Sequence, residues 1–210
     1  KVQYSDLGII ILMDVIEKVS GSSLDDLCQK WIFNPIDMNN TSYNPDELLL
    51  QNIAPTEDDD YFRNRLIQGE VHDENAYLLG GVSGHAGIFS NAYDLAKYAQ
   101  LFLNKGTWLG NRLFSDSNIK DFTARQNLPP GSDYALGWDT PSRNGKSSAG
   151  DYFSEGSYGH LGFTGTSLWI DSDNNIIVVL LTNRVHPTRE KKGMYSLRRN
   201  FHTEIMKAIL

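Results

Sequence analysis

Hydrophobic and polar positions follow a pattern that predicts helices in the first part of the chain. Residues 7–21 are apolar on all sides at first and gain a polar side from Asp14 onward, which indicates a largely buried helix ending at Gly21. A second helix is predicted from residue 22 or 23 to about 33, because Pro35 disfavours its continuation. The apolar positions expected on one buried face of this second helix are Leu24, Leu27, Cys28, Trp31 and Ile32.

The next part of the chain has weaker periodicity and is predicted to be irregular. Residues 39–70 are polar, and the acidic run 57–60 within them is most simply a solvated loop. The segment 69–81 carries a polar cluster at 72–75 between apolar residues. This segment is either a loop without a function or a loop that lines a cleft, and the sequence leaves both interpretations open.

Two more helices are predicted before residue 125. Asn91 and Asp94 resemble a capping pair, with aspartate in place of the usual Glu or Gln. The helix that they open ends before Gly106, and residues 115–124 are a further helix candidate. The positions expected to share one face of the first of these helices are Leu95, Ala99 and Phe102.

Strand patterns gather in the last third of the chain. Residues 135–138 are a short strand candidate, and the Ser- and Gly-rich segment 142–157 is predicted to be a mobile loop on a cleft rim. Residues 167–170 and 176–182 are strand-like runs joined by the hairpin loop DSDNN, and the second run is apolar enough for a central strand. The chain closes with a helix whose apolar face would contain Met194, Leu197, Phe201, Ile205 and Ile209.

Composition narrows the class of protein. The 210 residues carry a net charge of −7, so no basic stripe is available to displace counterions and nucleic acid is not the expected partner. No apolar run approaches the ~18 residues of a transmembrane helix. Cys28 is the only cysteine, which excludes an internal disulfide, and its position suits a small buried hydrophobe. The histidines have no metal-ligand spacing, so no metal site is predicted; they are His72, His85, His160, His186 and His202.

The segment 158–171, YGHLGFTGTSLWID, has the strongest chemical pattern. Gly159, Gly162 and Gly165 recur every third residue before an apolar strand. Glycine at such positions indicates that something approaches the backbone closely, because a Cβ would block it. The segment is therefore either a sheet edge opened to a ligand or a glycine-rich turn with a surface histidine. A second glycine-rich string, GHAG, holds His85, which is more simply a hydrogen-bonded structural histidine.

Two short motifs in chain order resemble those of a known family. Tyr4-Ser5-Asp6 resembles the second motif, Tyr-x-Asn, and His160-Leu161-Gly162 resembles the third motif, of the serine β-lactamase and penicillin-binding-protein superfamily. The intervening strings GGVSGHAGIFSNAYDLAKYAQLFL and YALGWDT are similar to its DD-peptidase and class C-like esterase branch. The resemblance implies an α/β (α+β) transpeptidase-like fold with an antiparallel sheet, flanking helices and a helical lobe.

The first motif of that family, Ser-x-x-Lys, is not found where chain order requires it. Only three residues precede Tyr4, and the string Ser117-Asn118-Ile119-Lys120 follows the second motif within a polar helix candidate. We therefore expect residues 1–210 to be the C-terminal portion of one serine-hydrolase domain, without its nucleophile and its first strands. Such a piece alone is expected to be inactive in an acylation assay.

The resemblance also implies roles for individual residues. Tyr4 would share protons with the serine and lysine of the first motif, and Asp6, which replaces the usual asparagine, could pair with that lysine or with His160. His160 would stand where the third motif usually has lysine, and the backbone N–H of Phe163 would serve in the oxyanion hole. The residues expected to contact substrate are Gly162, Thr164, His72 and Asp73.

Three functions stay open at this point. The first is acyl transfer through a serine ester, on an ester, amide or peptidoglycan-derived substrate and without a cofactor. The second is a non-catalytic module of the same fold that binds a cell-wall fragment. The third is a structural domain that supports a neighbouring catalytic domain. For the first, HDENA and GHAG resemble a subgroup sometimes found behind a family-3 glycoside hydrolase domain. By resemblance the protein would be bacterial and periplasmic or otherwise extracytoplasmic, and it could be covalently joined to an N-terminal domain.

Overall fold

The computed structural model describes residues 3–143, 145 and 147–210, and these form two compact units. The sheet unit comprises residues 95–182 and 191–210, and the helical unit comprises residues 3–94 and 183–190. Within the described residues, no helix combines the length and the apolar character that crossing a membrane requires.

The sheet unit is built on three antiparallel strands. They are β5 (Tyr158–Leu161), β6 (Ser167–Asp171) and β7 (Ile176–Leu180), in the order β5-β6-β7. Asp171 pairs with Ile176 at the hairpin between β6 and β7. The predicted hairpin is confirmed, but β6, not β7, is the central strand among those described.

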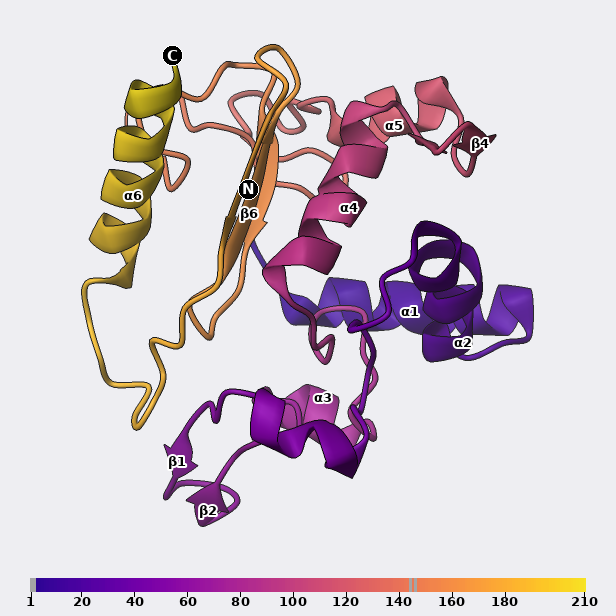
Figure 1. The fold of residues 1–210 in the computed structure, drawn as a ribbon, viewed down its shortest axis with the longest axis vertical. Helices are drawn as coiled ribbons and strands as arrows, with labels where there is room; N and C mark the ends of the chain where they lie inside the picture. The colour runs from indigo at the N-terminus through magenta and orange to yellow at the C-terminus, as the bar shows by residue number, and fades with distance from the viewer. Residues whose placement is uncertain (1–2, 144, 146) are drawn as a thin grey trace. The chain divides into compact units, whose positions relative to one another are not determined.

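Helices pack on both faces of this sheet, as Figure 1 shows. On one face, α4 (Ala92–Leu103) contributes Ala99 and Phe102 to a core that includes Tyr158 and Ile170. On the other face, α6 (Met194–Ile209) packs against Trp169 and Val178. The two faces of β6 are therefore both buried, because alternate residues of a strand point to opposite sides.

The buried face of α6 matches the predicted one only in part, because Phe201 and Ile205 do pack against the core. Arg198, His202 and Met206 are buried, whereas Leu197 and Ile209 are exposed. Arg198 and His202 also face the sheet, where they reach polar partners at Thr166 and Ser167. Apolar spacing alone did not reveal this, because two of the three buried side chains are polar.

The rest of the sheet unit is made of short elements. These are β3 (Thr107–Trp108), β4 (Asn111–Arg112) and α5 (Asp116–Thr123), whose predicted start is confirmed by a hydrogen bond from the Asn118 N–H to the Ser115 hydroxyl. The predicted strand 135–138 is wrong. It is a tight turn between Tyr134 and Asp139, which pair with each other, and Gly137 takes the left-handed conformation that the turn needs.

The segment 142–157 also belongs to the sheet unit, and residues 144 and 146 within it lie outside the described residues. Its described residues contain no helix or strand. Ala149 and Phe153 are nevertheless buried against Trp169 and Met206. These described parts of the segment are thus packed on the sheet, whereas a freely mobile loop was expected.

The helical unit begins with α1 (Asp6–Ser20), α2 (Leu24–Cys28), the π-helical turn η1 (Gln29–Phe33) and the 3₁₀ turn η2 (Asn34–Ile36). Gly21 ends α1 in the left-handed conformation, as predicted, and the Ser23 hydroxyl caps α2. Trp31 is exposed, contrary to the expected face, because the π turn widens the helix and changes its phase.

Two other predictions for this unit are wrong. None of the residues of α1 is buried, and Val19 is 84% exposed, since neighbouring elements cover only one side of the helix. The run 57–60 is not simply solvated, because Glu57 and Asp59 are 4% and 2% exposed. Both carboxylates are buried with hydrogen-bond partners that lie outside the run itself.

The remaining elements of the helical unit are short. They are η3 (Glu47–Asn52), the strand pair β1 (Asp58–Asp59) and β2 (Arg65–Leu66), and α3 (Glu74–Leu78). The segment 69–81 is thus partly helical. Its helix starts where the Asp73 carboxylate accepts a hydrogen bond from the Ala76 N–H at 2.8 Å.

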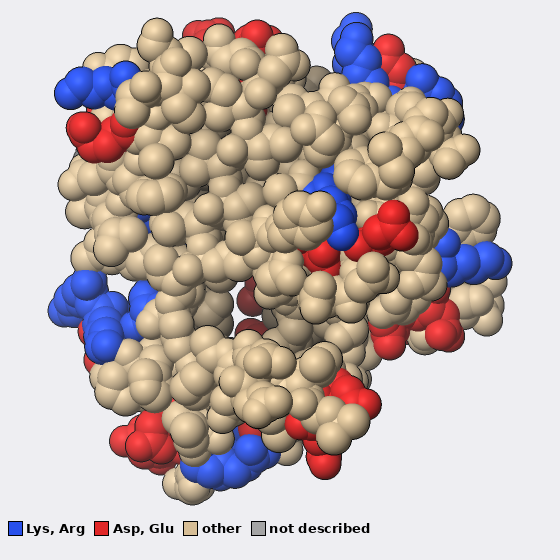
Figure 2. All heavy atoms as spheres, in the orientation of Figure 1, with Lys and Arg blue, Asp and Glu red and all other residues tan. Residues whose placement is uncertain are grey.

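Surface charge is mixed on the face drawn in Figure 2. There, Lys and Arg side chains lie in small groups beside Asp and Glu side chains. The net charge of the chain is −7. This face therefore offers no continuous basic stripe for a polyanion.

Candidate active site

The third-motif candidate lies at the end of β5 and in the turn that follows. His160 pairs with Leu168 in the sheet, and the turn 162–166 connects β5 to β6. The Gly162 N–H donates to the Thr166 carbonyl at 2.8 Å, and the Gly165 N–H donates to the Gly162 carbonyl at 3.1 Å. These bonds fix a tight turn that presents Phe163 outward, with its side chain 61% exposed.

Gly159 and Gly162 are required by close approach, as predicted, but the approaching groups belong to the chain itself. A Cβ on Gly159 would lie 2.5 Å from the Leu168 carbonyl oxygen and would collide with the Trp169 ring. A Cβ on Gly162 would collide with the Thr166 hydroxyl. These contacts account for two glycines without a ligand, so the pattern fixes the shape of the turn.

Arg198 holds the same turn from α6, and no sequence pattern indicated this role. Its Nη2 donates to the Thr166 carbonyl at 2.7 Å and also to the Gly162 carbonyl. Arg198 is buried, so these charge-assisted bonds are shielded from water. The Thr182 hydroxyl adds a bond to the Gly165 carbonyl at 2.5 Å. Thr164 lies half-buried within this braced turn.

His160 has an acidic neighbour, Asp139. The backbone of Asp139 pairs with Gly159 through N–H···O bonds of 2.8 and 2.9 Å, which brings it beside the third motif. Burial raises the pKa of the Asp139 carboxyl, and the charge of His160 opposes this rise only in part. A weakly acidic carboxyl beside an imidazole is suited to hold or pass a proton.

The second-motif candidate lies at the start of α1. Asp6 is the first residue of the helix, and Tyr4 precedes it with a side chain that is 63% exposed. An aspartate in the first turn interacts favourably with the helix dipole. This placement at the entrance to a helix agrees with the prediction. Tyr4 and Asp6 belong to the helical unit, while His160, Gly162, Phe163 and Thr164 belong to the sheet unit. The family resemblance implies that these residues line one cleft, and this stays a prediction.

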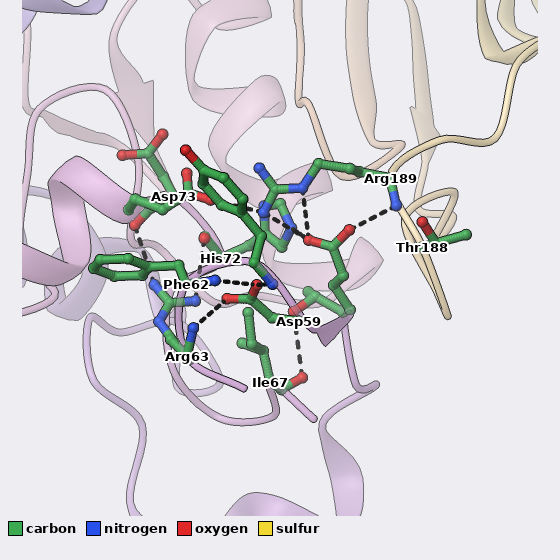
Figure 3. A network of polar contacts seen from close by, with 12 residues as sticks. Asp59, Phe62, Arg63, Ile67, His72, Asp73, Thr188 and Arg189 are labelled. Atoms are coloured by element: carbon green, nitrogen blue, oxygen red, sulfur yellow. Dashed lines mark hydrogen bonds and ion pairs between the residues drawn. The ribbon is translucent and has the colours of Figure 1, made fainter. Parts of the chain in front are cut away.

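His72 and Asp73 lie in a polar network of the helical unit, shown in Figure 3. The Nε2 atom of His72 is 2.7 Å from the Glu57 carboxylate, which also accepts bonds from the Arg189 N–H and Nε at 2.6 and 2.8 Å. Burial alone would raise the pKa of Glu57, but the hydrogen bonds from Arg189 and His72 outweigh it and lower that pKa. His72 is therefore placed to shape its loop, and its contact with substrate stays a prediction.

The Asp73 carboxylate turns toward a different partner. Its Oδ1 is 2.8 Å from the Nε2 atom of His85, whose Nδ1 is 2.8 Å from the Ser83 hydroxyl. Burial would raise the pKa of Asp73, but bonds from the Ala76 N–H and from His85 lower it instead. His85 is thus a hydrogen-bonded structural histidine, as the sequence suggested.

Neither Ser117 nor Cys28 lies in surroundings that suit a nucleophile. Ser117 lies exposed in the first turn of α5, with its hydroxyl 3.0 Å from the Ser115 hydroxyl. Cys28 is half-buried, and burial raises the pKa of its thiol to about 11. At neutral pH the thiol is therefore protonated and a poor nucleophile.

Comparison with known proteins settles the family. The profile described as Beta-lactamase matches residues 1–202. The chain belongs to the beta-lactamase family. The resemblance drawn from the two short motifs is thereby confirmed at the level of the superfamily.

Relatives with curated names agree with this placement. The chain is 38% identical over 200 residues to a Bacillus subtilis protein named N-acetylmuramyl-L-alanine amidase, covering 87% of the chain and 44% of that protein. It is 37% identical over 203 residues to a Salmonella gallinarum protein described as a candidate D-alanyl-D-alanine carboxypeptidase, covering 87% and 45%. The chain thus spans less than half the length of these relatives.

A solved structure supports the fold. A beta-lactamase from Mycobacterium bovis matches with a TM-score of 0.67 at 20% identity, covering 99% of the chain and 63% of that protein. At this level of identity the likeness shows the fold alone. The mixed architecture of helices and antiparallel strands predicted from the sequence is therefore confirmed.

Proposed function

We propose that the protein is a serine hydrolase that transfers an acyl group through a serine ester, with a cell-wall peptide or a related ester or amide as substrate. The observation that carries the proposal is the match to the beta-lactamase family over residues 1–202, with the second and third motifs in the expected order. The names of the amidase and carboxypeptidase relatives favour a peptidoglycan-derived substrate and an extracytoplasmic location.

In this proposal the nucleophilic serine and its lysine come from a segment outside residues 1–210. Tyr4 exchanges protons with them, Asp6 pairs with a nearby cation, and His160 supplies a group that can carry charge beside the oxyanion. The backbone N–H of Phe163 donates to the developing oxyanion, held in place by the turn that Arg198 braces. Gly162, Thr164, His72 and Asp73 shape the substrate pocket.

The test uses the longest form of the protein that its gene encodes. Hydrolysis of a small activated ester and of a D-alanyl-D-alanine peptide is measured for the parent and for Tyr4→Phe, His160→Ala and His160→Lys. His160→Ala should lower kcat/KM by roughly 10²–10⁴, the usual range for a positioned proton-transfer group. His160→Lys should retain activity and extend it toward higher pH, because lysine stays charged there.

Ser117→Ala is the matched control and should leave kcat/KM within about threefold. Equal pH–rate profiles for the parent and both His160 variants would remove His160 from the mechanism. Stoichiometric labelling of the 210-residue chain by fluorescent penicillin, mapped to Ser117, would show that the nucleophile had been wrongly assigned. Muropeptide binding without turnover in the longest form would favour the binding module instead.

A further inference from the structure

Three segments far apart in the sequence meet in the helical unit. Asp6 at the start of α1, Asp73 at the start of α3 and His85 in the GHAG loop each bring one carboxylate oxygen or ring nitrogen within 4.8 Å of the others. All three are at least half-buried. The sequence singled out Asp6 and Asp73 separately and left His85 without a function.

The imidazole of His85 is fixed at both nitrogens. Its side chain is 4% exposed, with the Ser83 hydroxyl 2.8 Å from Nδ1 and the Asp73 carboxylate 2.8 Å from Nε2. The pKa of Asp73 is lowered, and its ionised carboxylate can only accept a hydrogen bond, so Nε2 of His85 carries the proton that it donates to Asp73. Ser83 is itself buried, and the Tyr43 hydroxyl donates to the Ser83 carbonyl at 3.2 Å. This ring is therefore held in one orientation.

The loop that carries His85 is also packed directly on α1. A Cβ on Gly84 would lie 2.9 Å from the Ile9 carbonyl oxygen and 2.9 Å from the Ile9 Cγ2 atom. Gly84 thus lets the loop lie against the first turn of α1, next to Asp6. On the other side of the loop, a Cβ on Gly87 would lie 2.9 Å from the Tyr43 ring. Little room is left for the loop to move independently of the helix start.

We propose that His85, held by Ser83 and Asp73, is a positioning residue for the Tyr4-Ser5-Asp6 motif. The His85 ring fixes the Asp73 carboxylate through a hydrogen bond. The ring and this carboxylate together limit where the Asp6 side chain, within 4.8 Å of both, can lie. The position of the Asp6 side chain fixes the first turn of α1. The position of that turn then determines where Tyr4, two residues earlier, lies. His85 acts through other residues and does not touch substrate. The effect on activity rests on the proposed function, whereas the positioning effect does not.

Two amide substitutions separate the roles of the two ring nitrogens. In His85→Gln the amide N–H reaches the position of Nε2 and still donates to Asp73. In His85→Asn the shorter side chain can meet Ser83 but does not reach Asp73. Both variants are uncharged and polar, so burial costs are similar. We therefore expect His85→Gln to keep the motif in position and His85→Asn to lose it.

The first readout needs no activity. Backbone amide resonances of the 210-residue chain are compared by ¹H–¹⁵N NMR. His85→Asn should shift the amides of Tyr4, Ser5 and Asp6, whereas His85→Gln should shift them much less. Asp14→Asn, an exposed change about two turns further along α1, is the control and should shift only its own neighbours. Unmoved amides at residues 4–6 in a folded His85→Asn chain would overturn the proposal.

The second readout is kinetic and uses the longest form of the protein. His85→Asn should lower kcat by about 10²-fold with KM changed less than twofold, the cost expected of a displaced catalytic group. His85→Gln should restore kcat to within about threefold of the parent, and melting temperatures check folding. A merely structural role predicts that kcat follows thermal stability in both variants, and that result would refute positioning. If the parent is inactive, the proposed function fails and the NMR comparison still decides.

A divalent cation is the rival explanation for the same three groups. Asp6, Asp73 and His85 offer two carboxylates and an imidazole, a set that Zn²⁺ accepts. Titration of the chain with Zn²⁺, Mn²⁺ and Mg²⁺ should leave the resonances of these residues unchanged at micromolar metal. Saturable chemical-shift changes confined to Asp6, Asp73 and His85 would show a metal site, and that result would refute the proposed positioning by hydrogen bonds.

Discussion

Removing the charge of Glu57 should destabilise the helical unit in a way that depends on pH. Glu57 joins the segment 183–190 to the segment that precedes α3, because its carboxylate accepts from both the backbone and the guanidinium of Arg189 and from His72. The Arg189 Nη2 also bonds the Glu74 carboxylate at 2.7 Å. Glu57→Gln keeps the shape and one acceptor but loses the charge.

The expected magnitude follows from these contacts. Hydrogen bonds to a charged group contribute about 1.5–3 kcal/mol each, and some survive in the amide, so Glu57→Gln should cost about 2–3 kcal/mol. Glu57→Ala leaves Arg189 and His72 without this partner and should cost about 3–5 kcal/mol, the range for breaking a buried ion pair. Glu47→Gln, an exposed change in the same unit, is the control and should stay within about 0.5 kcal/mol.

The pH dependence gives an independent check. The pKa of Glu57 is lowered in the folded protein, so the unfolded chain binds the proton more readily. The contribution of Glu57 is therefore complete above its ordinary pKa of 4.5 and is lost as the pH falls through the lower folded value. The difference between parent and Glu57→Gln should shrink as the solution is acidified below pH 4.5.

The assay is urea unfolding combined with hydrogen exchange resolved by peptide, because two units need not unfold together. Peptides covering residues 55–74 and 183–190 should lose protection in Glu57→Gln before the rest of the chain. A stability difference below about 0.5 kcal/mol, or one that stays constant from pH 7 to 3, would refute the reasoning.

Three further predictions concern His202, Gly159 and Cys28. Burial, helped by the charge of Arg198 and opposed by the Ser148 carbonyl, lowers the pKa of His202 below its ordinary value of 6.5. The stability it contributes is complete above pH 6.5 and falls below it, so the melting temperature should drop more between pH 7 and 5 in the parent than in His202→Gln. Gly159→Ala should cost about 1–3 kcal/mol in urea unfolding, since the new Cβ overpacks against the neighbouring strand; an unchanged midpoint would contradict the close approach. Cys28 should resist a thiol reagent at pH 7 until urea unfolds the chain, and rapid labelling of the folded protein would show that the thiol is not protected.

Local pattern was enough to predict several elements and the family. The end of α1 at Gly21, the capping of α4 by Asn91 and the hairpin of β6 and β7 depend on residues a few positions apart. Helix hydrogen bonds and turn conformations act over that range, so the sequence carries the information directly. The motifs at Tyr4-Ser5-Asp6 and His160-Leu161-Gly162 are equally local, which is why the order of residues alone is enough to recognise them.

Only the tertiary structure decided which polar residues are buried and which residues are their hydrogen-bond partners. Glu57 and Arg189 pair across 132 positions. Arg198 and His202 of α6 are buried because they bond Thr166 and Ser167, which lie 32 and 35 positions earlier. A buried polar group is stable only when its partners are in place, and those partners come from distant segments. For that reason the sequence marked Asp6 as a motif residue, whereas only the fold brought Asp73 and His85 to its side.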